Sequence, residues 1–355
     1  MCCVMRSATS VSNGTERDDH TGSQRHDRPG WAVARTLCVM MPNAAQVADA
    51  LLSNVDRVVR GKRDEIRLAL CCLLTEGHLL LDDVPGTGKT SLAKAIANSI
   101  AGTWTRVQFT PDLLPTDITG VMVFDQRSSS FDFREGPVFT NVLIGDEINR
   151  GSPKTQSALL EVMEERQVTA DGVSRPVPRP FFVIATQNPR DFQGTFPLPD
   201  VQLDRFAMRL TLGYADPVTE VSILESFHRH RAEDDLAPVT DPAELDRAIT
   251  EIDGVDVVPS INEYIVQIAN GTRVHPDLRL GVSTRGTLTM LRVARAFAAT
   301  DGRDFVTPDD VKSIAASVVA HRIALTAEAE LRGARVESVL ADIVDDVPVP
   351  RTREG

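Results

Sequence analysis

One short stretch decides the fold: LLLDDVPGTGKTSL, which runs from Leu79 to Leu92. Its apolar beginning is typical of a buried strand, its middle is a loop that contains two glycines, and its end has helical spacing. A strand, a loop and a helix in this order, with Gly-Lys-Thr closing the loop, match the phosphate-binding pattern G-x-x-x-x-G-K-[ST]. The single departure is Asp83, which stands where the pattern has its first glycine.

The atoms that would hold phosphate all lie after Asp83. Backbone N–H groups that follow Gly86 can form an anion nest, and the next helix presents its positive end there. We expect Lys89 to neutralise the β and γ phosphates and the Thr90 hydroxyl to coordinate magnesium. Asp83 therefore does not disqualify the loop, although a glycine-rich turn with a chance lysine is the alternative. The predicted nucleotide-binding residues are Pro85, Gly86, Thr87, Gly88, Lys89, Thr90 and Ser91.

Polar side chains at the ends of two later apolar runs complete the predicted site. The run in NVLIGDEINR ends with Asp146, expected to hold magnesium through water, and Glu147, expected to polarise the attacking water. The run in FFVIATQNP ends with Asn188, which would orient the water or the γ-phosphate at the same sheet edge. Each signal is weak alone, since acids cap many strands and Asn before Pro is a common turn. Together with the loop, these residues predict hydrolysis of ATP with Mg²⁺.

The order of apolar and helical patterns predicts the architecture. Five short apolar runs, separated by helix-length segments, indicate an α/β fold with a buried parallel sheet: HLLLDD, TRVQFT, NVLIGDE, FFVIATQN and FAMRLTL. Beyond Pro217 only helical patterns follow, which indicates a second, all-helical domain. The expected parts are a disordered leader at 1–44, an ATPase core at 45–214, a helical lid at 215–350 and a tail at 351–355.

The composition narrows the class of protein. A chain of 355 residues that is 42% hydrophobic is long enough for a large globular domain and a smaller one. Fifty acidic residues against 38 basic ones give a net charge of -12, which disfavours a nucleic-acid partner. No apolar run approaches the ~20 residues of a membrane span, and five cysteines without an export signal indicate reduced thiols in the cytoplasm. Met40 and Met41, just before the first helical pattern, suggest that the leader is an over-extended start.

Four longer segments resemble the boxes of the MoxR family of AAA+ ATPases: QFTPDLLPTDITG (108–120), REGPVFTNVLIGDEINRGSPKTQSALLEVMEERQVT (134–169), ATQNPRDFQGTFPLPDVQLDRF (185–206) and GVSTRG (281–286). The resemblance covers nearly everything from residue 47 to 350. It implies a five-stranded αβα sandwich with an extra hairpin inserted in a helix, followed by a helical lid. SSSFDFREG would belong to the helix insertion, and TADGVSRPVPRP would be a hairpin turning at Asp171-Gly172.

The resemblance also implies roles for two arginines. Arg205 matches the family's arginine finger, which enters the neighbouring subunit's ATP site, and Arg285 matches the second sensor, which would touch the γ-phosphate. Surface salt bridging is the alternative for both. A finger supplied by a neighbour implies a ring, which for this family is a hexamer. Gly145 and Gly151 replace alanines that are common in the family, and we expect them to add backbone freedom near the metal site.

The work done by the ATPase follows only by analogy. The family resemblance implies chaperone-like remodelling, activation or metal-cofactor maturation of partner proteins, among them proteins with a von Willebrand factor A domain. Two alternatives stay open: a magnesium-chelatase-like motor subunit, and an ATP-gated binding switch that scarcely turns over. The sequence contains neither zinc-ligand spacing nor the G-x-S-x-G signature of a serine nucleophile, so a protease is not indicated.

Overall fold

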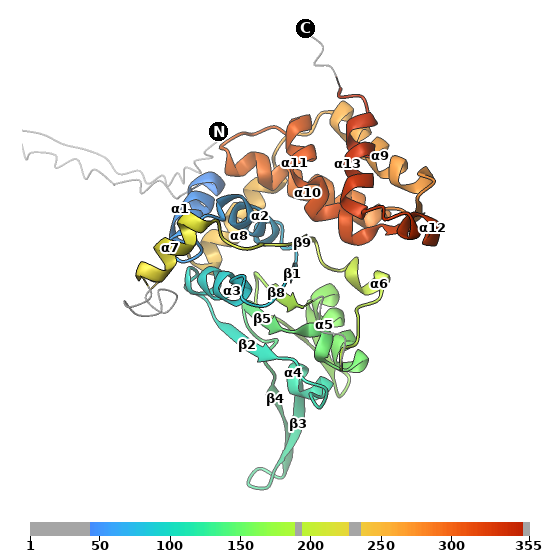
Figure 1. The fold of residues 1–355 in the computed structure, drawn as a ribbon. Helices are drawn as coiled ribbons and strands as arrows, with labels where there is room; N and C mark the ends of the chain where they lie inside the picture. Colours follow the sequence, from blue (N-terminus) through green and yellow to red (C-terminus); the bar gives the residue numbers. More distant parts are fainter. Residues whose placement is uncertain (1–42, 189–193, 227–235, 351–355) are drawn as a thin grey trace, which may run out of the picture. The chain divides into compact units, whose positions relative to one another are not determined.

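A computed structural model describes residues 43–188, 194–226 and 236–350. At its centre lies a five-stranded sheet in the order β2-β5-β8-β1-β9 (Figure 1). Its neighbouring strands pair in parallel, so the expected α/β fold is confirmed. Each strand overlaps one of the five apolar runs, and β2 begins one residue before its run: β1 (Leu79–Asp82), β2 (Trp104–Gln108), β5 (Val142–Asp146), β8 (Phe182–Gln187) and β9 (Met208–Leu210).

The two faces of the sheet belong to two hydrophobic clusters, because successive side chains of a strand point to opposite faces. On β1, Leu79 and Leu81 pack in the cluster that holds the buried residues of α1 (Ala44–Asp56), α2 (Arg63–Leu73) and α3 (Lys89–Asn98). Leu80 between them packs in the cluster that holds those of α5 (Pro153–Glu165). Burial on both faces explains why these strands read as continuous apolar runs.

The segment after the sheet is mainly helical. It contains α7 (Pro217–Ser226), α8 (Pro242–Asp253), α9 (Pro259–Val274), α10 (Thr284–Thr300), α11 (Pro308–Val319), η2 (Ala320–Arg322), α12 (Ala327–Leu331) and α13 (Val336–Asp346). A short antiparallel pair, β10 (Leu278–Leu280) with β11 (Ala324–Leu325), was not expected from the helical patterns. The remaining helices are α4 (Pro115–Thr119), η1 (Ile148–Arg150) and α6 (Asp200–Leu203).

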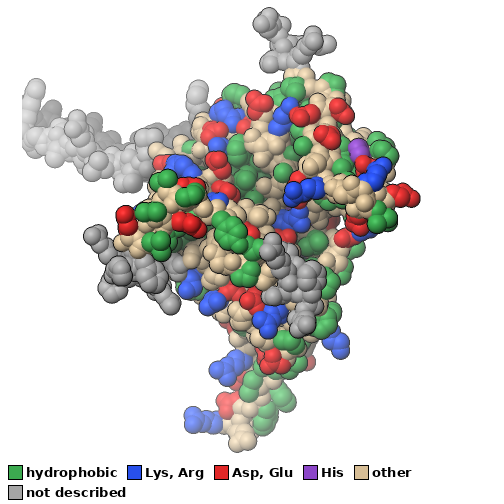
Figure 2. Space-filling view, in the orientation of Figure 1, with side chains coloured by type: hydrophobic (Ala, Val, Ile, Leu, Met, Phe, Trp, Pro, Cys, Tyr) green, Lys and Arg blue, Asp and Glu red, His purple; other side chains and the backbone are tan. Residues whose placement is uncertain are grey.

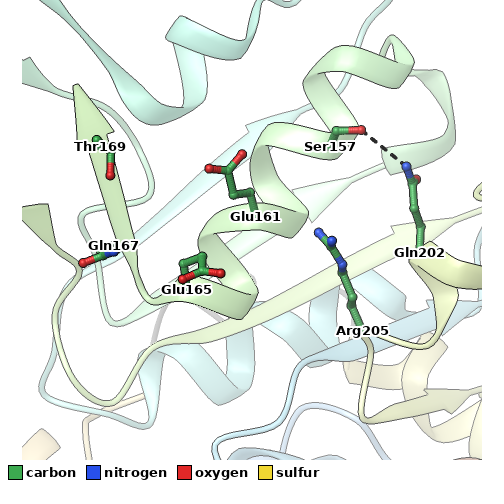
Figure 3. Close-up of a pocket in the computed structure, with 7 residues that line it drawn as sticks. All are labelled: Ser157, Glu161, Glu165, Gln167, Thr169, Gln202 and Arg205. Atoms are coloured by element: carbon green, nitrogen blue, oxygen red, sulfur yellow. Dashed lines mark hydrogen bonds between the residues drawn. The ribbon is translucent and has the colours of Figure 1, made fainter. Parts of the chain in front are cut away.

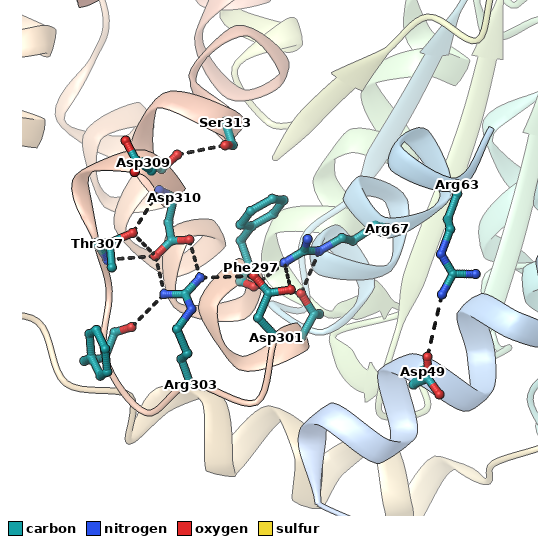
Figure 4. Close-up of polar contacts among 12 residues, drawn as sticks. Asp49, Arg63, Arg67, Phe297, Asp301, Arg303, Thr307, Asp309, Asp310 and Ser313 are labelled. Carbon is teal, nitrogen blue, oxygen red and sulfur yellow. Dashed lines mark hydrogen bonds and ion pairs between the residues drawn. The ribbon is translucent and has the colours of Figure 1, made fainter. Parts of the chain in front are cut away.

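The amino-terminal helices pack against helices from the far end of the chain. Arg67 of α2 donates to the Thr300 hydroxyl and the Phe297 carbonyl, both at 2.9 Å, and pairs with Asp301 at 2.7 Å (Figure 4). A boundary between residues 214 and 215 therefore separates two kinds of architecture but cuts through shared packing. The predicted division into core and lid stays a prediction, and the predicted leader and tail lie almost wholly outside the described residues.

Both expected insertions are β-hairpins. SSSFDFREG contributes β4 (Ser130–Glu135), which pairs with β3 (Gly120–Asp125) after the short helix α4. This hairpin stands clear of the other elements in Figure 1, and apolar side chains gather along it in Figure 2, with the rings of Phe124 and Phe131 5.2 Å apart. The second hairpin joins β6 (Gln167–Ala170) to β7 (Val173–Pro176).

The turn of the second hairpin follows the expected chemistry. Asp171 has φ +52° and Gly172 has φ +71°. Positive φ at both central residues is typical of the type I′ turns that Asp-Gly favours. The prediction that the chain turns at Asp171-Gly172 is therefore confirmed.

Candidate nucleotide site

The loop between β1 and α3 has the backbone of an anion nest. Gly86 and Gly88 have φ of +85° and +91°, a region that L side chains rarely adopt. Gly88 is also the residue that precedes the first turn of α3, whose free N–H groups form the positive end of the helix. A Cβ at either glycine would meet no atom within 4 Å, so the backbone conformation, not crowding, requires glycine here.

Lys89 lies against the start of the same loop. Its ammonium donates to the carbonyl of Val84 at 2.9 Å and to the carbonyl of Asp83. The Thr87 hydroxyl donates to the Val84 carbonyl at 3.2 Å, which closes the loop on itself. Burial lowers the pKa of Lys89, while the nearby carboxylates of Asp83 and Asp82 oppose this. The lysine that would meet the phosphates is thus held beside the nest by loop carbonyls.

The side chain of Asp83 accepts hydrogen bonds from two backbone segments, the phosphate loop that follows β1 and the segment that follows β9. It is 6% exposed, and its Oδ1 accepts from the N–H of Val84 at 2.7 Å. Its Oδ2 accepts from the N–H groups of Leu212 and Gly213, at 3.0 and 2.6 Å, just after β9. Asp83 therefore ties the start of the phosphate loop to the segment that leaves the sheet. Nothing in the local sequence signals this role.

Thr90 and Asp146 come together at the carboxyl edge of the sheet. The Thr90 hydroxyl donates to Asp146 Oδ1 at 3.3 Å, and the Thr186 hydroxyl donates to the same oxygen at 3.2 Å. Arg106 pairs with Asp146 Oδ2 at 2.6 Å. Neither residue was predicted from the sequence: Thr186 lies in the segment 185–206 without a signal of its own, and Arg106 lies in none of the four segments that resemble the family.

The donor set suits magnesium that arrives with a nucleotide. One hydroxyl and one carboxylate are hard oxygen ligands, and Mg²⁺ is commonly held by one or two protein oxygens together with substrate phosphates. Asp146 is only 3% exposed. Its hydrogen bond from Thr90, which lies in the first turn of α3, nevertheless puts its carboxylate next to the phosphate loop. Among the described residues no group of three or more His, Cys, Asp or Glu could hold a metal ion unaided.

Glu147 leaves the strand in an unusual conformation. Its φ and ψ are +55° and +51°, a left-handed backbone that costs a non-glycine residue roughly 1 kcal/mol or more. Its N–H donates to the Thr186 hydroxyl at 3.0 Å, so Thr186 holds both Asp146 and Glu147. The carboxylate pairs with Arg150 at 2.9 Å and is well exposed. The Glu147 side chain thus lies partly exposed just after the end of β5.

Asn188 lies at the same edge because β8 neighbours β5 in the sheet. It directly follows the end of β8, is 9% exposed, and its carbonyl accepts from Asn149 Nδ2 at 3.3 Å. Parallel strands deliver their carboxyl ends to one edge, which is where ligands bind in open α/β sheets. The structure therefore brings Asn188, Glu147 and Asp146 together at the loop edge, and their chemical roles stay predictions.

Gly145 and Gly151 have a packing reason that the sequence analysis did not find. A Cβ at Gly145 would lie 3.2 Å from the ring of Phe109, and one at Gly151 would lie 2.5 Å from it. Phe109 is fully buried, and Gly151 has an ordinary φ of -70°. The two glycines accommodate the Phe109 ring, which is a steric reason for them, and the expectation that they add backbone freedom stays a prediction.

Arg205 and Arg285 share one carboxylate. Arg205 Nε lies 3.1 Å from Glu164 Oε2, and Arg285 pairs with the other oxygen of Glu164. The hydrogen bond from Arg285 lowers the pKa of Glu164. Arg205 precedes β9, Arg285 lies in the first turn of α10, and Glu164 lies in the last turn of α5. The sequence analysis missed Glu164, which is one of several acids in that helix.

The two arginines lie at the opposite end of β1 from the phosphate loop. They line a pocket of about 280 Å³ together with Gly77 and His78, which immediately precede β1, whereas the loop follows its last residue. Four strand residues span ~13 Å. Arg205 also borders a second pocket, of about 450 Å³, beside α5 and β6 (Figure 3). Both arginines therefore lie about one strand length from the loop of their own chain.

Comparison with known proteins defines the class. The family described as "ATPase family associated with various cellular activities (AAA)" matches residues 78–208, and the AAA lid domain matches residues 270–343. The crystal structure of a candidate ATPase from Cytophaga hutchinsonii superimposes with a TM-score of 0.80 at 34% identity, covering 87% of this chain and 96% of that one. Fold and loop together thus define an AAA ATPase with its lid.

Two relatives narrow the family. The uncharacterized protein YeaC of Bacillus subtilis is 44% identical over 304 residues, which span 86% of this chain and 95% of YeaC. The chaperone MoxR1 of Mycobacterium tuberculosis is 36% identical over 344 residues, which span 94% of this chain and 89% of MoxR1. The chain belongs to the MoxR family of AAA+ ATPases. Across the residues that the structure describes, every helix is too short or too polar to cross a bilayer.

Proposed function

We propose that this protein hydrolyses ATP to ADP and phosphate with the help of magnesium. The observation that carries the proposal is the cluster at the carboxyl edge, where Thr90 and Thr186 both bond Asp146 and Thr186 also fixes Glu147. Lys89 would exchange its loop carbonyls for the β and γ phosphates. Oxygens of Thr90 and Asp146 would hold magnesium, which neutralises charge on the phosphates when bound.

Proton transfer falls to Glu147 in this proposal. Its exposed carboxylate, just after the end of β5, would accept a proton from the attacking water. Asn188, beside it on β8, would orient that water or the γ-phosphate. The pair with Arg150 gives the carboxylate a fixed resting position on the surface, from which it can rotate towards the loop.

The arginine positions support a site completed by a second subunit. Arg205 and Arg285 lie beside the residues that precede β1, whereas the loop follows its last residue, and a guanidinium contributes to phosphoryl transfer only where it can reach the transferring group. We therefore assign both arginines to the neighbouring subunit's nucleotide. AAA proteins act as oligomers, and a head-to-tail arrangement that closes gives a ring. The expected form is a hexamer.

The proposed work is remodelling or activation of partner proteins in the cytoplasm. MoxR1, similar over nearly all of its length, is described as a chaperone, which supports a chaperone-like role here. Partners with a von Willebrand factor A domain and assistance in metal-cofactor maturation extend the proposal by family analogy. Identification of the protein that co-purifies with the chain separates this role from that of a magnesium-chelatase-like motor subunit.

The first test is steady-state ATP hydrolysis in magnesium as a function of protein concentration. Specific activity should rise with concentration, because a complete site needs two subunits. Arg205→Ala and Glu147→Gln should each be inactive alone and partly active when mixed, since each ring then contains sites with an intact glutamate facing an intact arginine. Flat, negligible turnover in well-formed rings would contradict the motor and favour the ATP-gated binding switch.

A further inference from the structure

A buried guanidinium from the lid holds the segment that carries Arg205. Arg322, at the end of η2, is only 4% exposed. Its Nε donates to Asp204 Oδ1 at 2.8 Å, its Nη1 to the Ala207 carbonyl at 3.0 Å and its Nη2 to the Phe206 carbonyl at 2.6 Å. Arg322 thus binds the residues on both sides of Arg205, with Asp204 before it and Phe206 and Ala207 after it.

The same carboxylate is bound a second time, from α10. Ser283 Oγ donates to Asp204 Oδ2 at 3.0 Å. Ser283 also caps α10, where its Oγ accepts from the N–H of Gly286 at 3.1 Å, and Arg285 lies between these two residues. Asp204 therefore joins the segment of Arg205 to the start of the helix that carries Arg285. We call Asp204, Ser283 and Arg322 the Asp204 latch.

The path of Arg322 explains the last glycine of GVSTRG. A Cβ at Gly286 would lie 2.9 Å from Arg322 Cδ and 2.7 Å from Val282 Cγ1. Gly286 is inside α10 and has no positive φ, so its backbone does not require glycine. Gly286 leaves the space through which the Arg322 side chain reaches the segment of residues 204–207.

We propose that Arg322 is a positioning residue for Arg205: through the Asp204 latch it holds Arg205 and Arg285 as one unit towards the neighbouring subunit. The inference rests on the proposed function, in which both arginines act on the neighbour's nucleotide. Among the residues that the structure describes, the Arg205 side chain pairs with the partly exposed Glu164, a contact that solvent screens. Arg322 is buried, and its guanidinium donates to Asp204 and to the carbonyls of Phe206 and Ala207, so the backbone on either side of Arg205 has one preferred arrangement that sets the position of the finger.

One consequence is mechanical. Arg322 lies at the end of the α11–η2 segment of the lid. Its guanidinium bonds residues 204–207, which lead into β9. A displacement of η2 must therefore carry residues 204–207 with it or break the latch. Movement of the lid in one subunit is thereby coupled to the arginines offered to the next subunit.

The test variant is Arg322→Lys, which keeps the charge and loses the planar fork that binds several acceptors at once. We expect kcat to fall at least about tenfold, since a finger is worth roughly 10³ to 10⁵ in rate when fully removed. The Kd for ADP should stay within about twofold, because the loop of the same chain lies at the other end of β1. Gly286→Ala displaces Arg322 without removing it. It should likewise lower kcat and leave the Kd for ADP unchanged, and it provides the test if the lysine variant does not fold.

Mixed rings distinguish positioning from structural support. Arg322→Lys subunits have an intact loop and glutamate, and Glu147→Gln subunits have an intact latch and finger. We expect the mixture to exceed the summed activities of the two proteins alone. If Arg205→Ala is rescued by Glu147→Gln subunits while Arg322→Lys is not, the inference is overturned. If Arg205→Ala itself is not rescued, the proposed function fails first.

Arg303→Lys is the matched control. Arg303 pairs with the buried Asp310 of α11 through two bonds (Figure 4). Within the described part of the chain, the other polar partners of its side chain are Phe305 and Asp301, which lie outside residues 204–207. This variant should lower the melting temperature as Arg322→Lys does while kcat stays within about twofold of the parent. An equal loss of kcat in both variants would show that general weakening of the lid accounts for the effect, and the positioning role would be wrong.

Discussion

Replacing Asp83 by glycine restores the phosphate-loop pattern and is expected to damage the protein. Asp83→Gly removes a buried carboxylate that accepts three backbone N–H bonds, from Val84 at 2.7 Å, Leu212 at 3.0 Å and Gly213 at 2.6 Å. The pattern alone predicts an improvement or no change. The structure predicts the reverse, because these N–H groups have Asp83 as their acceptor.

The size of the effect follows from the bonds lost. A hydrogen bond to a charged group contributes about 1.5–3 kcal/mol, and bonds to one carboxylate are not additive. Loss of all three should lower the free energy of unfolding by about 4 kcal/mol, to which glycine adds roughly 0.5–1 kcal/mol of backbone entropy. At roughly 2–4 °C per kcal/mol for a large domain, the melting temperature should fall by about 10 °C.

Asp83→Asn provides the graded comparison. Its amide oxygen can face Leu212 and Gly213 and keep two bonds, while its NH₂ group faces the Val84 N–H and loses the third. The expected loss is about 2 kcal/mol, half of that in the glycine variant. Urea unfolding followed by circular dichroism measures both variants, and fluorescent ADP reports the affinity of the loop. A glycine variant as stable as the parent, or one that binds ADP more tightly, would refute this reasoning.

Three further predictions address catalysis, acid stability and thiol reactivity. Glu147→Gln should keep ADP binding within about twofold while turnover falls at least about 100-fold, because only the proton acceptor is lost. Lys89→Ala should instead weaken ADP binding itself. Equal losses of ADP affinity in the two variants would contradict these roles. Burial lowers the pKa of His78 to about 3 from its ordinary 6.5. Between pH 3 and pH 6.5 the imidazole is therefore protonated in the unfolded chain but neutral in the folded one. The free energy of unfolding should therefore fall as pH drops from 6.5 towards 3, and His78→Gln should flatten this slope in urea titrations at several pH values; an unchanged slope would count against the His78 assignment. Burial raises the pKa of Cys71 to about 12 and raises that of Cys72 as well, so a thiol reagent at pH 8 should label neither in the folded protein. Rapid labelling of either cysteine, located by peptide mass spectrometry, would contradict this burial.

The five-stranded sheet and the loop could be predicted from the sequence because both are encoded locally. A parallel strand buried on both faces needs a continuous apolar run, and β5 is such a run, buried along its whole length. Gly86 and Gly88 are required by the backbone conformation of the nest itself. The strand ends then place Asp146, Glu147 and Asn188 at one edge, since parallel neighbouring strands end together.

The partners of these residues could not be predicted in the same way. Arg106 comes from the neighbouring strand β2, and which strand neighbours β5 is decided by the order of the sheet. Gly151 is explained only by the ring of Phe109, a residue 42 positions earlier in the chain. Neither residue belongs to a repeating pattern, so neither carries a local signal.

The sequence by itself determined the class of fold, the phosphate loop and the acids that follow the strands, because each depends on a few adjacent residues and their backbone preferences. Only the tertiary structure decided what Asp83 holds, where Arg205 and Arg285 lie and how Arg322 reaches them. These are contacts between segments far apart in the chain, from the bonds of Asp83 to Leu212 to the bond of Arg322 to Asp204. Their geometry depends on how the whole chain packs, and local residue patterns do not specify it.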